Sequence, residues 1–169
     1  PPPDAPAPPF AESVRTALFE RGGARWLGAR RSEALWEFVR ERAPLVTELC
    51  RSTGFVHGDF QGDNILVRKN DGPWIVAAIL DWEWAHGGCR LEDVGSLLRS
   101  ETGAQAQFDD GLERGFARAG APLPAGWQEW ASIVDLAALC EKLAFPRHRG
   151  DVTVRTIALC ERCMMRYAK

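Results

Sequence analysis

The chain has 169 residues, of which 46% are hydrophobic and 26% are charged, and its formal net charge is -2. This composition is typical of an ordinary soluble globular domain, and the mixed charges argue against a nucleic-acid partner. The apolar runs fall far short of the roughly 18 residues of a membrane span and no secretory leader opens the chain, so we expect a cytoplasmic protein without a membrane partner.

The first half of the chain begins with a proline-rich segment. Residues 1–9 contain six prolines, which predicts an extended linker or the remnant of a hinge. The domain itself is expected to span residues 10–169. Apolar residues at helical intervals predict helices at residues 10–21 and 32–50, with Ser32 as a helix N-cap.

The middle of the chain changes character. Short runs rich in β-forming residues predict strands at residues 55–56, 65–68 and 74–80. The sequence Asn70-Asp71-Gly72 predicts a hairpin turn between the last two strands. Helical periodicity then returns, and it predicts helices at residues 91–100, 106–119, 127–145 and 152–167. The expected fold class is therefore α+β and mostly α-helical, with a small β-hairpin.

The five cysteines are Cys50, Cys89, Cys140, Cys160 and Cys163. An odd number spread over helix-like segments is a poor disulfide framework and suits a reducing compartment. Cys160 and Cys163 form a CxxC sequence, but no second pair at metal-binding spacing accompanies it. We therefore interpret these two as small packing residues on one helix face.

Residues 56–93 contain the side chains that suggest chemistry. Asp59 and Asn64 flank a loop, and Asp81 follows the second strand of the hairpin that Asn64 begins. Because a hairpin brings its two ends together, Asn64 and Asp81 should be near neighbours. Carboxylate and amide oxygens are suitable ligands for Mg²⁺, which leaves its other positions to water and substrate phosphate. Such a group predicts phosphoryl transfer, with Asp59 receiving a proton from the acceptor hydroxyl. Taken singly, these residues would be ordinary turn residues.

The order of these residues resembles a known signature. His57-Gly58-Asp59, four further residues, Asn64, a hairpin and then Asp81-Trp82-Glu83 are similar to the motif of the aminoglycoside phosphotransferase family. That family has a protein-kinase-like fold, and its motif corresponds to the H-R-D-x-x-x-x-N and D-F-G segments of protein kinases. The resemblance implies a kinase-like C-terminal lobe, with the hairpin carrying the catalytic loop and the metal-binding Asp.

Roles for individual residues follow from the resemblance alone. Asp59 would be the catalytic base, and Asn64 and Asp81 would bind Mg²⁺. The resemblance further implies that His57 braces the loop and that Asp93 anchors it by hydrogen bonds. Leu66 and Leu80 would form the floor under the adenine of ATP, or the guanine of GTP.

The chain departs from the family pattern at two informative places. Gln61 stands where protein kinases have a lysine near the transferred phosphate. No glycine-rich loop and no lysine precede His57, since the lysines of the chain are Lys69, Lys142 and Lys169. We therefore expect the N-terminal nucleotide-binding lobe to be absent from these residues, either because they are a piece of a longer parent chain or because the natural protein is truncated. In both cases we expect these residues to be inactive alone.

Three functions remain open at the level of the sequence. The first is a kinase transferring the γ-phosphate of ATP or GTP to a hydroxyl of a small molecule. The second is a non-catalytic, kinase-like binding or interaction domain. The third is a metal-dependent hydrolase using His57, Asp59, Asp81 and His86 with Zn²⁺ or Mn²⁺. The oligomeric state and the acceptor are not encoded in any pattern we find.

Acidic residues on the later predicted helices are candidates for binding a cationic acceptor. The alternative is that they form an ordinary solvent-exposed helix face, as acidic residues on helices usually do. The residues are Asp109, Asp110, Glu113, Glu129, Asp135 and Glu141.

Overall fold

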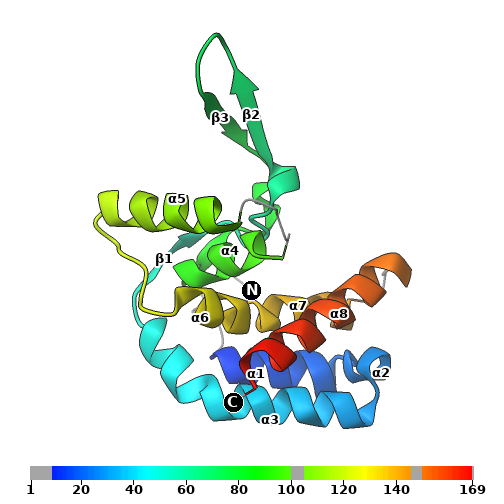
Figure 1. Ribbon diagram of the computed structural model, residues 1–169. Coiled ribbons are helices and arrows are strands. Elements are labelled where there is room, and N and C mark those ends of the chain that lie inside the picture. Colours follow the sequence, from blue (N-terminus) through cyan, green and yellow to red (C-terminus); the bar gives the residue numbers. More distant parts are fainter. Residues whose placement is uncertain (1–8, 100–104, 146–149, 169) are drawn as a thin grey trace.

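The computed structural model describes residues 9–99, 105–145 and 150–168 (Figure 1). Its α-helices are α1 (Phe10–Arg15), α2 (Ala24–Leu27), α3 (Ala29–Leu49), α4 (Arg90–Leu97), α5 (Gln105–Arg118), α6 (Trp127–Val134), α7 (Leu136–Ala144) and α8 (Gly150–Tyr167). A π-helical turn at Thr16–Glu20 continues α1, and 3-10 turns lie at Gly62–Asn64 and Trp82–Trp84. The strands are β1 (Thr53–Val56), β2 (Ile65–Lys69), β3 (Trp74–Ile79) and β4 (His86–Cys89).

The core lies among the helices and not in a sheet. Apolar side chains of α1 and its π-helical turn, α3, α4, α6, α7 and α8 form one buried cluster, in which Leu18, Leu35, Ile133 and Leu136 are fully buried. Figure 1 shows α1 and α3 below α6, α7 and α8, with α4 and α5 above them. The helices pack because each presents an apolar stripe at helical spacing to its neighbours.

The strands form two separate antiparallel pairs. β1 pairs with β4, with Val56 opposite His86. β2 pairs with β3 in a hairpin, with Ile65 opposite Ile79. The hairpin projects away from the helical body (Figure 1), and most of its side chains are exposed, so it contributes little to the core.

The predicted fold class is confirmed at the level of a mostly helical α+β protein with small antiparallel sheets. The predicted helix at residues 127–145 is instead two helices, α6 and α7, separated by Asp135. Asp135 keeps right-handed helical backbone angles, and the bonds from its N–H to Ala131 O and from Leu139 N–H to its own O continue the helical path. Strand β4 was not predicted, because its sequence His-Gly-Gly-Cys has low β-propensity.

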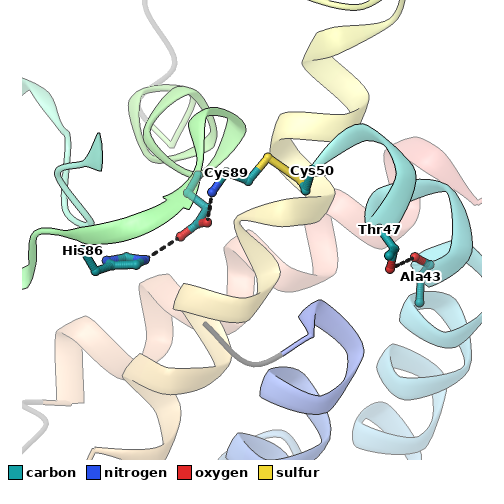
Figure 2. The surroundings of a disulfide bond; sticks show 6 residues. Ala43, Thr47, Cys50, His86 and Cys89 are labelled. Carbon is teal, nitrogen blue, oxygen red and sulfur yellow. Dashed lines mark hydrogen bonds and ion pairs between the residues drawn. A yellow bond between two sulfur atoms is a disulfide. The ribbon is translucent and has the colours of Figure 1, made fainter. Parts of the chain in front are cut away.

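The expectation of a poor disulfide framework is wrong for one pair of cysteines. Cys50 and Cys89 form a disulfide across 39 residues, with their Cα atoms 5.1 Å apart. The bond joins the C-terminal end of α3 to the residue directly before α4 (Figure 2). Their pairing depends on the α3 end meeting the β1–β4 pair, which sequence spacing does not reveal.

The interpretation of Cys160 and Cys163 as packing residues is confirmed. Both are buried free thiols on α8, and burial raises the pKa of the Cys163 thiol to about 12. In the described part of the chain, no helix has both the length and the apolar character needed to cross a bilayer.

Candidate active site

The loop after β1 is braced by the side chain of His57. This imidazole is 2% exposed, and its Nε2 lies 2.7 Å from the carbonyl oxygen of Leu80. Its Nδ1 accepts a hydrogen bond of 3.3 Å from the backbone N–H of Asp59. Because a carbonyl only accepts and a backbone N–H only donates, His57 carries its proton on Nε2. Both ring nitrogens are therefore occupied in connecting the loop to the end of the hairpin.

Asp93, in the first turn of α4, holds the same loop from the other side. Its Oδ2 accepts a hydrogen bond from the N–H of His57 at 2.8 Å, and its Oδ1 accepts one from the N–H of Gly58 at 3.0 Å. Gly58 has a positive φ of 80°, and a Cβ there would lie 2.5 Å from the carbonyl oxygen of Trp84. Glycine is therefore required at this position both by backbone conformation and by space.

The carboxylate of Asp59 is surrounded by hydrogen-bond donors. Lys142 Nζ lies 2.9 Å and Arg99 Nη1 3.5 Å from its Oδ1, while Gln61 Nε2 donates to its Oδ2 at 2.9 Å. Burial raises the pKa of the Asp59 carboxyl, but the hydrogen bond and charge of Lys142, assisted by Arg99, outweigh burial and lower it. Asp59 is therefore ionised at neutral pH and has a donor on each oxygen.

Asn64 and Asp81 lie at the two ends of the hairpin. The side-chain amide of Asn64 donates to the backbone oxygen of Asp59 at 2.9 Å, which leaves its Oδ1 as the atom able to face a cation. The N–H of Leu80 donates to the carbonyl of Asn64 at 2.9 Å, so Asp81 follows directly after the residue bonded to Asn64. Asp81 is exposed and adopts a left-handed backbone conformation, with φ 64° and ψ 56°.

The remaining predicted site residues lie on the surface of the hairpin. Leu66 is 49% exposed and Leu80 is 42% exposed. Next to them, the ring of Trp82 lies 4.6 Å from the ring of His57 and is stacked on Phe55 at 5.6 Å, measured between centroids. Apolar side chains thus line the hairpin end beside the polar loop, where a flat apolar ligand would bury them.

Sequence reasoning missed the cations that contact Asp59. Lys142 comes from the last turn of α7, 83 residues along the chain, and Arg99 follows α4, 40 residues along. Arg99 also makes a bidentate ion pair with Asp135, with N–O distances of 2.9 and 2.7 Å. Isolated charges on helices carry no sequence signal of such a meeting, and only the packing of α4 and α7 around the loop creates it.

The structure does not support the metal ligands proposed for the hydrolase hypothesis. Within the described residues, no three His, Cys, Asp or Glu side chains converge as a metal site. His57 has both ring nitrogens engaged, and His86 bonds the carbonyl of Trp84 and the carboxylate of Glu92. Asn64 and Asp81, one amide and one carboxylate, are a smaller donor set, and Mg²⁺ would take its remaining ligands from water and phosphate.

The acidic residues proposed for a cationic acceptor do not all line one cavity. Glu141 pairs with Arg21, Asp110 pairs with Arg114, and Glu113 accepts from the indole N–H of Trp127. Asp109 and Asp135 line a cavity of about 310 Å³, but the same cavity is lined by three cations, Arg99, Arg162 and Arg166. The acidic side chains that line this cavity are therefore offset by arginines, and the cavity does not favour a polycationic ligand.

Comparison with known proteins defines the class. The model of the phosphotransferase enzyme family (APH) matches residues 1–132. This match covers the loop, the hairpin and α4, so the chain belongs to that family of phosphotransferases. Among curated proteins, none matches the chain significantly.

Proposed function

We propose that this chain provides the catalytic lobe of a small-molecule kinase, which transfers the γ-phosphate of ATP or GTP to a hydroxyl of its acceptor. The observation that carries this proposal is the arrangement around one loop of a chain in the phosphotransferase family. There, the Asn64 amide bonds the backbone of Asp59, and the hairpin end before Asp81 bonds the backbone of Asn64.

Asp59 is the proposed catalytic base. Its carboxylate is ionised and half-buried, and the loop that carries it is fixed by His57 and Asp93. A rigid carboxylate orients an acceptor hydroxyl and receives its proton as the oxygen attacks phosphorus. The acceptor hydroxyl takes the place of the Gln61 amide on Oδ2, since that donor is neutral and exchanges more readily than a cation.

Asn64 and Asp81 are the proposed holders of Mg²⁺. Asn64 keeps Oδ1 available, and the Asp81 carboxylate makes no hydrogen bond or ion pair within the part of the chain that is described. When bound, Mg²⁺ would neutralise negative charge on the phosphates. Leu66 and Leu80, both exposed, would pack against the nucleotide base.

The lobe that covers the nucleotide is proposed to lie outside these 169 residues. No lysine and no glycine-rich hairpin precede the loop, and phosphate positioning supplies much of the rate of a kinase. The isolated chain should therefore turn over little ATP. Robust ATP consumption by the isolated chain would contradict this part of the proposal.

The proposal is tested by a phosphate-transfer screen of the complete parent protein with labelled ATP and GTP. The acceptors are aminoglycosides, macrolides, choline-like alcohols and sugars. We expect Asp59→Asn to reduce transfer by about 10²- to 10⁴-fold, the usual contribution of a general base, with Mg·ATP affinity largely retained. Asp81→Asn should weaken Mg·ATP binding itself, because it removes the one charged ligand.

The exposed loop residue Asp63 supplies the matched control. Like Asp59→Asn, Asp63→Asn removes one negative charge from the loop, but it should leave both phosphate transfer and Mg·ATP binding unaltered. Unchanged nucleotide affinity in Asp81→Asn would remove its metal role. Binding of Mg·ATP without transfer to any acceptor would favour the alternative of a non-catalytic binding domain, in which Asp59 stays occupied by Lys142 and Gln61.

A further inference from the structure

Lys142 reaches the loop from a distant helix and ends beside the proposed catalytic carboxylate. Its Nζ lies 2.9 Å from Asp59 Oδ1, and 34% of its side chain is exposed. An ammonium group has three N–H donors, and the contact with Asp59 uses one of them. The other two remain for a ligand that approaches Asp59 from solvent.

The second cation at Asp59 does not have this freedom. The Arg99 side chain is only 6% exposed, and its Nε and Nη2 are committed to Asp135 in a bidentate pair. Gln61, on the other oxygen of Asp59, is neutral. Among the described partners of this carboxylate, Lys142 is therefore the one that combines a positive charge with access to an incoming anion.

We infer that Lys142 binds the phosphoryl group during its transfer, and so supplies the positive charge that position 61 lacks in this chain. This inference rests on the proposed kinase function and extends it to α7. The loop has a neutral glutamine at position 61, and the cation next to Asp59 comes instead from Lys142, which the packing of α7 brings to the loop.

The chemical step needs no further reactant than the nucleotide and the acceptor alcohol. The hydroxyl oxygen forms a bond to the γ-phosphorus, and the bond from that phosphorus to the bridging oxygen breaks, so the nucleoside diphosphate leaves with the electron pair. The hydroxyl proton passes to Asp59. Lys142 exchanges no proton, and it donates hydrogen bonds to the phosphoryl oxygens on which negative charge is spread.

A purely structural role for Lys142 is the competing explanation. The ion pair also ties α7 to the loop, and such a tie would stabilise the fold without any contact to phosphate. Moving the positive charge from residue 142 to residue 61 distinguishes phosphate binding from the structural tie. Gln61→Lys would place a cation beside Asp59, where the Gln61 amide already contacts that carboxylate, without connecting the loop to α7.

The test measures binding of inorganic tripolyphosphate with Mg²⁺ to the complete parent protein by calorimetry, and thermal unfolding in parallel. Lys142→Met should weaken binding on the order of tenfold or more, the effect of losing one hydrogen bond to a charged group. Lys142→Gln should weaken it similarly, although its amide preserves a donor for Asp59 and hence the tie to α7. Adding Gln61→Lys to Lys142→Met should restore binding to within about threefold, but should not restore Tm.

The control is Glu141→Gln, which alters the neighbouring residue of α7 and its ion pair with Arg21 but not the contact with Asp59. It should leave tripolyphosphate affinity unchanged. Wild-type affinity in both Lys142 variants, or failure of Gln61→Lys to restore binding, would overturn the inference and assign Lys142 a structural role. Absence of Mg²⁺-dependent binding in the wild-type protein would overturn the kinase proposal together with it.

Discussion

Arg99 is a charged residue that the fold removes almost completely from water, and Asp135 is the nearer of the two carboxylates that compensate its charge. Its side chain is 6% exposed and that of Asp135 is 4% exposed. Burial lowers the pKa of the guanidinium, but the charge and hydrogen bonds of Asp135 outweigh burial and raise it, so Arg99 stays charged. Without the Asp135 carboxylate, Arg99 would keep only the longer contact of 3.5 Å with Asp59, so its buried charge would be compensated only in part.

Asp135→Asn should therefore lower the free energy of unfolding by about 3 kcal/mol, the lower end of the range for broken buried ion pairs. Urea denaturation measures this loss. The exposed pair of Arg114 and Asp110 on α5 is the matched control, and Asp110→Asn should cost less than about 1 kcal/mol. Equal losses of unfolding free energy in Asp135→Asn and Asp110→Asn would contradict the argument that the burial of Arg99 makes its ion pair important for stability.

At the scale of elements, the approach of α4 to α6 is set by Gly95. A Cβ at this position would lie 2.7 Å from the Cβ of Asp135 and would also meet the carbonyl of Ala131. Both obstacles belong to the helical path of α6 and α7, so a methyl group would force the helices apart. The displacement would disturb α4, which carries Asp93 and leads to Arg99.

Gly95→Ala should destabilise the protein by about 1 to 3 kcal/mol, the usual cost of overpacking a core. Gly111→Ala is the control, because a Cβ at this glycine of α5 meets nothing within 4 Å. It should stabilise the protein by up to about 1 kcal/mol through helix propensity. Chemical denaturation of both variants gives the comparison, and the same sign of change in both would contradict the packing argument.

Elements with strong local patterns were predictable from the sequence. Helical periodicity indicated α3, α5 and α8 to within a few residues, and Asn70-Asp71-Gly72 indicated the β2–β3 hairpin. Strand β4 was missed, because its backbone pairing with β1 forms without help from β-forming side chains. The division at Asp135 was missed too, since the apolar periodicity of α6 runs into α7.

In the candidate site too, residues close together in the sequence were predictable, and contacts between distant residues were not. His57, Asp59, Asn64, Asp81 and Asp93 come from 37 consecutive residues. The chain path through one loop and one hairpin associated Asp59, Asn64 and Asp81, and the family resemblance added His57 and Asp93. Lys142 and Arg99 reach Asp59 only because α7 and the end of α4 pack around that loop. Such contacts depend on helix packing angles, which a single sequence does not determine.

At the scale of the whole molecule, a disulfide connects the end of α3 to the junction of β4 and α4. Cys50 directly follows α3, and Cys89 is the last residue of β4, directly before α4, where its N–H donates to the Glu92 carboxylate (Figure 2). The bond closes 39 residues that include β1, the loop and the whole hairpin. A closed segment of this length loses chain entropy in the unfolded state, which stabilises the fold by about 4 kcal/mol in the loop-entropy treatment.

The unfolded, unreduced chain should therefore present three thiols to Ellman's reagent, those of Cys140, Cys160 and Cys163, and the reduced chain should present five. The folded chain should react slowly, because all three free thiols are buried. Reduction should lower the free energy of unfolding by about 4 kcal/mol. Replacing both Cys50 and Cys89 by alanine should produce the same loss and abolish any further effect of reductant. Five reactive thiols before reduction would contradict the disulfide, and the α3 end would then be held to α4 by packing alone.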